Sequence, residues 1–412
     1  MICQYLLSAA SAYLRYLRRV TLTTTAPTAD VLPYGEFLTD EHHAIREAVR
    51  DFASNEIAPR SFQVDKEAKF PMETFKKLGQ LQMLGLLVPE EHGGAGADYR
   101  SYAIAVEEIG RACGSTGLSY AAHCSLGTKP IVMFGTDAQK KKYLPKLASG
   151  EFIGCWALTE PGTGSDASAQ KTTAKKVGDH WVLNGTKQFI TNATDADVAI
   201  IMAMTDQSKG NKGISAFIVD KGTPGFFVSK VEKKLGMRGS PTASLTMEDC
   251  KIPAENIIGE VGEGYKQALI TLEGGRISIG ALALGIAQAA LDSALQYAKQ
   301  REAFGQPIGK FQLIQGYLAD MATQVQAARL LLYHAAWMKD HGKRVTLEGS
   351  QAKLFASEIA SRVCNLCVQI HGGYGYIEDF PAERFLRDAK LCEIGEGTSE
   401  IQRLLIARQL GL

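Results

Sequence analysis

The 412-residue sequence lacks a clear excess of charge, since 45 lysines and arginines stand against 44 aspartates and glutamates. It therefore predicts no broad basic surface for nucleic acid or an anionic membrane, and an anionic ligand must be held by a few local groups. Cysteines are few and scattered, and of the eight only Cys364 and Cys367 form a close pair. Because no second pair completes a zinc site, we interpret both as buried thiols in a reducing compartment, with a redox or metal pair as the alternative.

Long apolar runs are also missing. No stretch beyond the amino end reaches 18 apolar residues without a charge, so we expect no membrane-spanning helix. What the chain does have is 45% hydrophobic residues and a length that allows two or three packed units around a large core.

The amino end contains no acidic residue before Asp30, whereas Arg15, Arg18 and Arg19 and several serines and threonines precede it. This composition is typical of a mitochondrial transit peptide, so we expect residues 1–37 to be a leader and the mitochondrial matrix to be the compartment. A secretory signal with its apolar core over 2–14 is one alternative, although only the amino terminus supplies positive charge before it. A disordered bacterial leader, with a cytoplasmic protein, is the other.

The segment from Thr39 to about Gly150 has the apolar period of helices. Its first helix should end near Pro59. The residues that fall near one face of that helix are Ile45, Val49, Phe52 and Ile57. We predict an N-terminal α-helical domain over residues 38–151.

At about Phe152 the apolar period changes from helical to alternating, and turn residues become frequent. Asn184-Gly185 stands between two alternating segments, and this dipeptide predicts a hairpin turn. Further strands are expected over 198–204, 214–219, 226–231 and 243–247. Because no helical pattern intervenes, we predict a central antiparallel β domain over 152–260, a sandwich or a barrel.

From about Gly264 the helical period returns and holds to the end, with two longer helical stretches before Gly372. One stripe of 3.6-residue period is formed by Ile279, Leu282, Ile286, Ala290, Ala294 and Tyr297. We predict a C-terminal α-helical bundle domain over 261–412, and an α+β fold for the whole chain.

The segment Gly395-Glu396-Gly397 near the carboxyl end places an acidic residue between two glycines. Glycine inside a helix costs about 1 kcal/mol relative to alanine, so we expect Glu396 on a turn. Ser399 and Gln402 have the spacing of a capping box, which predicts a last helix from Glu400 to Leu410. The carboxylate would then lie on a short loop between two helices, either as a solvated acid or as a reactive group.

This segment resembles the C-terminal signature of the acyl-CoA dehydrogenase family, in which the matching glutamate removes the α-proton of a fatty acyl thioester. The resemblance extends from about Leu38 to the carboxyl terminus, and separated motifs follow the family's order. These motifs lie at 156–166, 189–192, 272–276, 301–305 with Gln312, 369–375 and 391–403. The family match implies an FAD-dependent enzyme of the short-chain or short-branched-chain type.

The resemblance implies two groups of FAD contacts. In the β domain, Thr159 and Thr191 would hydrogen-bond the flavin edge, Trp156 and Phe189 would line it, and Ser165 would sit between the cofactor and the CoA portion. In the family, the segments at Arg301 and Gln369 bind the FAD pyrophosphate and adenosine across a subunit interface, which implies a homotetramer. The further cofactor contacts implied are Leu158, Phe304, Gln312, Gly372, Gly373, Thr398 and Glu400.

The acyl-CoA contacts that the resemblance implies are Ser165, Glu273, Arg276, Gly395, Gly397 and Arg408. Arg276 would lie near the thioester end and Arg408 near the CoA tail. Isovaleryl-type members take their base from the helix position that Gly275 occupies here, and with no carboxylate there Glu396 keeps the role. Gly395 replaces the tyrosine usual in short- and medium-chain members and matches isovaleryl-type members. A short acyl group, straight or branched, is the expected substrate.

The implied reaction is the α,β-dehydrogenation of an acyl-CoA to a trans-2-enoyl-CoA, as in fatty acid β-oxidation or branched-chain amino acid catabolism. Glu396 would take the α-proton, FAD would accept the hydride, and an electron-transfer flavoprotein would receive the electrons. Burial beside the flavin should raise the pKa of Glu396 above its ordinary value of about 4.3. Two alternatives are an acyl-CoA oxidase that uses oxygen and a non-catalytic helical binding protein with the same fold.

Overall fold

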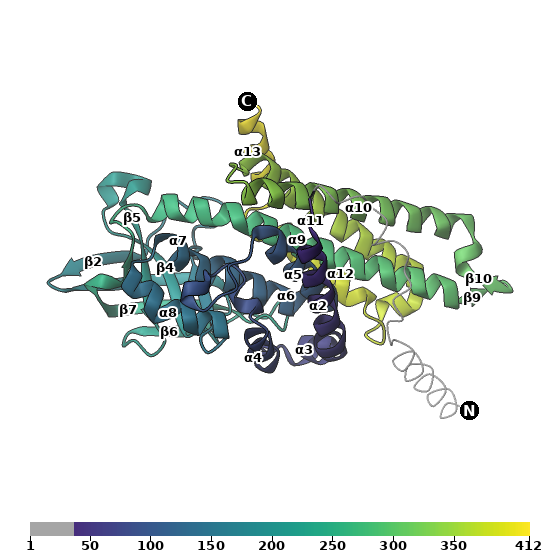
Figure 1. The fold of residues 1–412 in the computed structure, drawn as a ribbon, viewed down its shortest axis with the longest axis horizontal. Coiled ribbons are helices and arrows are strands. Elements are labelled where there is room, and N and C mark those ends of the chain that lie inside the picture. The colour runs from purple at the N-terminus through teal and green to yellow at the C-terminus, as the bar shows by residue number, and fades with distance from the viewer. Residues whose placement is uncertain (1–36) are drawn as a thin grey trace.

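A computed structural model describes residues 37–412 (Figure 1). The predicted leader therefore lies outside the described residues, apart from Phe37. Residues 38–151 are helical, as expected. The elements of this part are α2 (Asp40–Phe52), η1 (Ala53–Ile57), η2 (Ala58–Arg60), α3 (Ser61–Glu67), α4 (Met72–Gln80), η3 (Met83–Gly85), η4 (Glu90–His92), α5 (Tyr99–Ala112), α6 (Gly114–Ala121), η5 (Ala122–Thr128), α7 (Lys129–Phe134) and α8 (Asp137–Ser149).

The central part is built on one large sheet with the strand order β6-β7-β3-β2-β4-β5-β8. Its elements are β1 (Gly154–Ala157), β2 (Thr173–Val177), β3 (His180–Thr191), β4 (Val198–Met204), η6 (Gln207–Gly213), β5 (Ile214–Asp220), β6 (Phe226–Val231), β7 (Thr242–Pro253), η7 (Ala254–Asn256) and β8 (Ile257–Ile258). Most neighbours are antiparallel, as expected. The sheet is nevertheless mixed, because β1 pairs with β4 in parallel, as β2 does at the single pair Thr173 and Met204.

The hairpin predicted at Asn184-Gly185 is wrong, because β3 runs straight through both residues. The chain turns earlier, at Gly178 and Asp179, so that Val177 pairs with His180. The Asn184 side chain instead bonds across to Asp249 of β7, at a shift in the β3–β7 register. Gly185 has a φ of +144°, and a Cβ there would lie 2.6 Å from Thr172 Oγ1. Close approach of a second segment, and not a turn, therefore requires this glycine.

The C-terminal part is helical, as expected, apart from one short β ribbon. Its elements are α9 (Gly264–Gln300), β9 (Glu302–Ala303), β10 (Gln306–Pro307), η8 (Ile308–Lys310), α10 (Gln312–Asp340), α11 (Thr346–His371), η9 (Gly372–Tyr376), α12 (Ala382–Cys392) and α13 (Ser399–Gln409). In Figure 1, α9 runs from the sheet to the β9–β10 ribbon at the opposite end of the molecule. Cys364 and Cys367 are buried free thiols on α11.

Helix α9 is the centre of the helical core. It is the one helix among residues 37–412 that is long and apolar enough to cross a membrane by length and composition. Core helices pass the same test, and 83% of its most apolar 18-residue window is buried inside the protein. The absence of a membrane-spanning segment thus stays a prediction, and the apolar character of α9 is explained by its burial.

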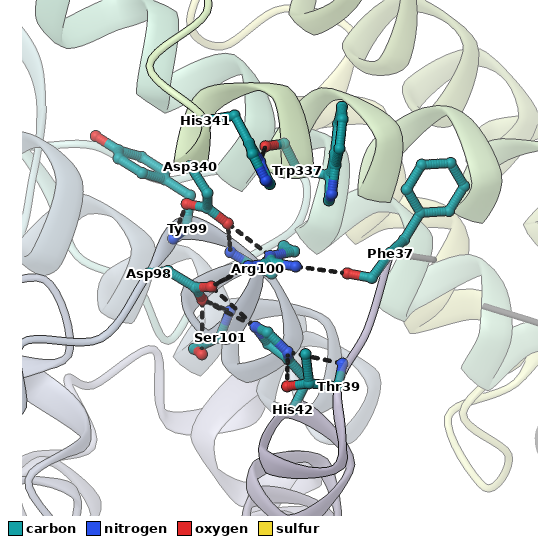
Figure 2. Close-up of polar contacts among 10 residues, drawn as sticks. All are labelled: Phe37, Thr39, His42, Asp98, Tyr99, Arg100, Ser101, Trp337, Asp340 and His341. Carbon is teal, nitrogen blue, oxygen red and sulfur yellow. Dashed lines mark hydrogen bonds and ion pairs between the residues drawn. The ribbon is translucent and has the colours of Figure 1, made fainter. Parts of the chain in front are cut away.

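The start of α5 is tied to the end of α10 by charged groups (Figure 2). The carboxylate of Asp340 accepts from the backbone N–H groups of Tyr99 and Arg100 and from the Arg100 side chain. Asp98 caps α5 by accepting from Ser101 N and also accepts from Arg100. These bonds satisfy N–H groups that the first turn of a helix leaves free. They fix α5 where it packs on α9, with Tyr99 next to Gly274.

Candidate active site

Glu396 lies on the short connection between α12 and α13, as predicted. It has a φ of +54° and is followed by Gly397 with a φ of +94°. The predicted cap is displaced by one residue: Thr398 is the N-cap, its hydroxyl accepts from Ile401 N, and the helix begins at Ser399. The Ser399–Gln402 capping box is therefore wrong, because the Gln402 side chain is used elsewhere.

Two side chains, one from α13 and one from α11, hold the backbone of this loop. Gln402 Nε2 donates to the carbonyl oxygens of Glu396 and Gly397, at 3.2 and 3.1 Å. Lys353, a fully buried residue of α11, donates to the Gly397 carbonyl at 2.7 Å. A lysine in this position costs desolvation, which lowers its pKa, and it is tolerated because the carbonyl accepts from it. The loop conformation is thus set by helices α11 and α13 together.

The carboxylate of Glu396 points at α9. An added Cβ at Gly275 would lie 1.7 Å from Glu396 Oε2, so the glycine provides the space that the carboxylate occupies. Oε2 is buried and has no hydrogen-bond partner among residues 37–412. Burial raises the pKa of Glu396 from 4.5 to about 7, against the opposing effect of the positive charges of Lys353 and Arg276. The site therefore holds a carboxyl group that exchanges a proton near neutral pH.

Arg276 follows Gly275 on α9 and is also buried. Its Nε and Nη1 have no hydrogen-bond partner within the described part of the chain. Burial lowers the pKa of Arg276, while the negative charges of Glu273 and Glu396 act in the opposite direction. Glu273 itself accepts from the Thr346 hydroxyl. Arg276 thus has unused donors and directly follows Gly275, which the Glu396 carboxylate contacts. It is suited to donate hydrogen bonds to a polar or anionic group of a ligand.

The predicted flavin-edge residues come together on β1, β3 and the loop that follows β1. Strand β3 and the loop after β1 are hydrogen-bonded to each other, since Gln188 N donates to the carbonyl oxygen of Thr159 at 2.8 Å. Phe189 has a φ of +59° and is 62% exposed, although it is a large aromatic residue. Trp156 has a buried indole N–H without a partner in the described structure. Ser165 is exposed on the loop. Aromatic faces and hydroxyls gathered on one surface suit the flat polar ring of FAD.

This surface adjoins the Glu396 region through α9. Trp156 and Leu272 pack against the same buried cluster, which also contains Leu158. Leu272 immediately precedes the segment that contains Gly275 and Arg276. Helix α9 therefore packs on the cluster beneath Trp156 and Leu158 and also provides the glycine that the Glu396 carboxylate faces.

The second group of predicted FAD contacts lies elsewhere. Arg301 follows the end of α9, and Phe304 is 95% exposed on the β9–β10 ribbon. Arg301 lines a cleft of about 460 Å³ with Tyr297, Ile308, Ile370, His371, Gly372, Gly373, Tyr374 and Ile377. Gln312 and Gln369 are exposed at the first turn of α10 and the last turn of α11. Twenty-five residues of α9 separate Arg276 from Arg301, roughly 38 Å along a helix. One chain therefore does not bring the two groups together.

The remaining predicted contacts surround the carboxyl end. Arg408 is exposed in the last turn of α13, and Glu400 is exposed in its first turn. A Cβ at Gly395 would approach only the Leu391 carbonyl oxygen, at 3.6 Å, so this position has room for a side chain. At Gly397 it would lie 2.6 Å from Gln402 Nε2, and only the glycine fits.

The sequence patterns indicated neither Lys353 nor Lys187, and they gave Gln402 a different role. Lys353 and Gln402, which hold the Glu396 loop, are polar residues at positions of helices that prove to be buried. Lys187 is a fully buried lysine on β3 beneath the Thr159 loop. A charged residue inside an otherwise apolar period is the signal that could have identified Lys353, since such a residue needs a partner.

The three parts of the chain match known families. Residues 39–151, 155–250 and 262–411 match those described as acyl-CoA dehydrogenase N-terminal, middle and C-terminal domains. A probable acyl-CoA dehydrogenase of Bacillus subtilis (strain 168) is 56% identical over 374 residues, which are 90% of this chain and 98% of the relative. The mitochondrial short-chain specific acyl-CoA dehydrogenase of Rattus norvegicus is 52% identical over 373 residues, 90% of each chain.

Solved structures are similar over nearly the whole described chain. Butyryl-CoA dehydrogenase from Megasphaera elsdenii has a TM-score of 0.89 and 45% identity, covering 91% of this chain and 99% of the other. A chain from the structure described as the electron transferring flavoprotein of Acidaminococcus fermentans has a TM-score of 0.89 and 48% identity, covering 90% and 98%. An acyl-CoA dehydrogenase from Bacillus anthracis complexed with FAD has a TM-score of 0.86 and 40% identity, covering 91% and 67%.

Proposed function

This chain belongs to the acyl-CoA dehydrogenase family, whose members are FAD-dependent oxidoreductases, and we propose that it oxidises a short-chain acyl-CoA with Glu396 as the base. The role of Glu396 rests on its position. Its Oε2 is buried, has no hydrogen-bond partner among residues 37–412 and lies against Gly275, the residue before Arg276 with its unused donors. We assign Glu396 the removal of the α-proton.

Position matters more than basicity in this step. The α-proton of a thioester is far too weakly acidic for a free carboxylate, so the site must stabilise the enolate that forms. The backbone N–H of Glu396 has no acceptor within residues 37–412, and the loop that presents it is held by Lys353 and Gln402. We propose that this N–H donates to the thioester oxygen while the carboxylate takes the α-proton.

The raised pKa of Glu396 suits this role. A base with a pKa of about 7 is ionised over the upper half of the neutral range and keeps the abstracted proton better than an ordinary glutamate. Arg276 and Lys353 limit the shift, because their positive charges favour the carboxylate. We therefore expect activity to rise with pH through about 7, as Glu396 loses its proton.

We propose that Trp156, Leu158, Thr159, Phe189 and Thr191 hold the flavin. The exposed Phe189 and the unpaired Trp156 indole N–H fit this cofactor better than they fit a solvent surface. FAD, when bound, supplies the acceptor for the hydride of the β-carbon. Ser165, Glu273, Gly395, Gly397 and Arg408 are proposed acyl-CoA contacts, and Thr398 and Glu400 are proposed to adjoin the cofactor.

We propose that FAD binding requires a second copy of the chain, within a homotetramer. Arg301 lies roughly 38 Å along α9 from Arg276, and Gly372 and Gly373 line the same cleft as Arg301. We propose that this cleft, with Phe304, Gln312 and Gln369, completes a neighbour's site. The 95% exposure of Phe304 supports this assignment, since a large aromatic side chain is seldom left in solvent.

The proposed electron acceptor is an electron-transfer flavoprotein. A solved relative of this chain comes from a structure described as such a flavoprotein of Acidaminococcus fermentans, which supports this choice. Reduction of the purified enzyme by substrate, followed by exposure to air, tests it. Slow reoxidation in air together with fast reoxidation by the flavoprotein is expected, and rapid oxidation by oxygen alone would indicate an acyl-CoA oxidase.

The proposed substrates are short acyl-CoA esters, with a branched chain accommodated beside Gly395. Short-chain specific and butyryl-CoA relatives support the length, and the room above Gly395 supports the branch. Relatives include mitochondrial enzymes of mammals and enzymes of bacteria. We propose the mitochondrial matrix if the chain is eukaryotic and the cytoplasm if it is bacterial.

The test of the base is Glu396→Gln. The amide keeps the shape of the carboxylate but cannot accept the proton. The variant should therefore retain FAD and bind butyryl-CoA while losing nearly all dehydrogenation, measured by flavin bleaching and by turnover with an artificial acceptor. Substantial turnover would contradict the assignment of Glu396.

A further inference from the structure

Lys187 lies in the middle of β3 and is fully buried, which is rare for a lysine. Its ammonium donates to three oxygens: the carbonyl of Leu158 at 3.2 Å, Glu160 Oε1 at 2.8 Å and Gln170 Oε1 at 3.0 Å. Leu158 and Gln170 lie at the two ends of one loop, which connects β1 to β2. One side chain therefore joins the beginning and the end of this loop.

Glu160, near the beginning of the same loop, binds the backbone at the end of the loop. Its carboxylate accepts from the backbone N–H of Lys171 at 2.7 Å and from that of Thr172 at 3.0 Å, in addition to Lys187. The carboxylate is buried as well. The pair Lys187–Glu160 thus makes five hydrogen bonds with the Leu158–Thr172 segment or within itself, all at the base of the loop.

The charge state of the Lys187 side chain follows from the number of oxygens that accept hydrogen bonds from it. Three oxygens surround Nζ, and only the ammonium has three N–H donors, since a neutral amine has two. Burial lowers the pKa of Lys187 to about 8, against the attraction of Glu160, and Lys187 lowers the pKa of Glu160 in spite of burial. The pair is therefore ionic at neutral pH. A buried ion pair seldom stabilises a fold more than apolar side chains would, so its presence here suggests a task beyond stability.

Part of the loop tip is open to solvent, because a Cβ at Gly162 or Gly164 would meet nothing within 4 Å. Thr163 between them is buried, and its backbone pairs with that of Glu160, so Glu160 also supports the tip. Ser165 lies on this tip, exposed. Thr159 follows directly after the carbonyl that Lys187 holds, and its own carbonyl accepts from Gln188 N, next to Lys187. The position of both residues depends on how the base of the loop is held.

We propose that Lys187, paired with Glu160, is a positioning residue that holds the Leu158–Thr172 segment in the conformation that receives the flavin edge and the CoA portion of the substrate. This role rests on the proposed function, because it concerns the same loop. Lys187 touches neither cofactor nor substrate in this assignment and acts through the backbone of Leu158 and through Glu160.

The first test is Lys187→Met in the full-length holoenzyme. We expect weaker FAD binding and a raised KM for butyryl-CoA, each by about tenfold or more, because buried acceptors lose their donor and the loop loosens. The kcat at saturating FAD and substrate should change much less, since Glu396 is unaffected. Hydrogen exchange measured by mass spectrometry should rise in the peptides that cover 158–172.

A matched control is Arg329→Met. Arg329 of α10 also pairs with a buried carboxylate, that of Glu107 on α5, at 2.8 Å. This variant should lower thermal stability without changing FAD affinity, KM or exchange in 158–172. Equal changes in both variants would overturn the proposal, because they would reflect general destabilisation.

The double variant Lys187→Met/Glu160→Met separates positioning from charge pairing. The double variant leaves no unpaired buried charge, so thermal unfolding should recover in part relative to Lys187→Met. The recovery is incomplete because the N–H groups of Lys171 and Thr172 lose their acceptor. FAD affinity should stay low and KM high, because neither Lys187 nor Glu160 then holds the Leu158–Thr172 segment. Wild-type binding and KM in the double variant, or unchanged exchange in 158–172 in either variant, would refute the role.

The wild type is measured first, so that the two proposals can fail separately. Absence of FAD or of butyryl-CoA oxidation in the wild type would refute the proposed function. Hydrogen exchange in residues 158–172 needs neither FAD nor substrate. It therefore tests whether Lys187 holds this segment even if the proposed function is wrong.

Discussion

Replacement of Gly275 by alanine should remove activity without harming the fold. The added Cβ would lie 1.7 Å from Glu396 Oε2, and Cβ atoms in proteins essentially never come within 3.0 Å of another heavy atom. The carboxylate must therefore move by at least the difference, about 1.3 Å. It is free to move, because it is the end of a flexible side chain, whereas Gly275 lies in the middle of the 37-residue helix α9.

The expected magnitude follows from this displacement. Misplacing a catalytic group by about 1 Å can reduce the rate on the order of 100-fold, so Gly275→Ala should lower kcat by about that factor. The helix itself should gain, because alanine is favoured over glycine in a helix by roughly 0.5–1 kcal/mol. Activity and stability should thus change in opposite directions.

The assay is steady-state oxidation of butyryl-CoA with an artificial acceptor, together with thermal unfolding of the FAD-saturated protein. Gly280→Ala is the matched control. It adds the same methyl group to α9, but its Cβ would meet Leu332 Cδ1 at 3.2 Å and not Glu396. A Gly275→Ala kcat within about threefold of the wild type would refute the placement of the carboxylate. So would an equal loss in the control.

Three further predictions concern Glu396, the cleft at Arg301 and the position of Gly395. Because burial raises the pKa of Glu396 from 4.5 to about 7, the folded protein loses stability as pH rises through that interval, and Glu396→Gln should add up to about 3 kcal/mol to the free energy of unfolding at pH 8 and almost nothing at pH 4. Denaturant unfolding at both pH values checks this, and an equal gain at each would contradict the shift. Arg301→Ala should lose FAD and loosen the oligomer together, because it removes the cation of the exposed cleft at the far end of α9. Sedimentation with flavin absorbance reports both, and a holoenzyme that sediments as a stable monomer would rule out a shared site. Gly395→Tyr should depress kcat/KM for isovaleryl-CoA more than for butyryl-CoA, by roughly 1–3 kcal/mol for each methylene-sized clash, since only the Leu391 carbonyl oxygen now faces that position. Equal losses on the two substrates would mean that Gly395 does not set the acyl specificity.

The elements that the sequence predicts best are those specified by local periodicity. Strand β4 begins and ends at the predicted residues, Val198 and Met204, and α9 begins at the predicted Gly264. The turn at Glu396 was also predictable, because two flanking glycines disfavour a helix whatever surrounds them. The family resemblance then supplied the cofactor, which the comparisons with known acyl-CoA dehydrogenases support, and the candidate base, which stays a proposal.

The errors arise where a distant segment competes with a local preference. Asn184-Gly185 is a strong turn signal, but Asn184 is bonded to Asp249 of β7 and Gly185 is crowded by Thr172, so the strand continues. Ser399 has good capping chemistry, but Thr398 takes the cap and Gln402 is drawn to the carbonyls of the Glu396 loop. In both cases hydrogen bonds made after folding outweigh a preference of a few tenths of a kcal/mol to about 1 kcal/mol.

The sequence by itself determined the order of helices and strands and the loop that bears Glu396, because these depend on residues near one another in the chain. The residues of the candidate site came from the family resemblance and stay a prediction. The tertiary structure alone decided that Gly275 faces the Glu396 carboxylate and that the buried Lys353 and Lys187 hold the Gly397 and Leu158 carbonyls. It also decided that Arg301 lies at the end of the molecule opposite the sheet. These relations join residues that are tens to hundreds of positions apart. They depend on which faces of the helices and the sheet pack together, and a burial pattern read along one chain does not specify that pairing.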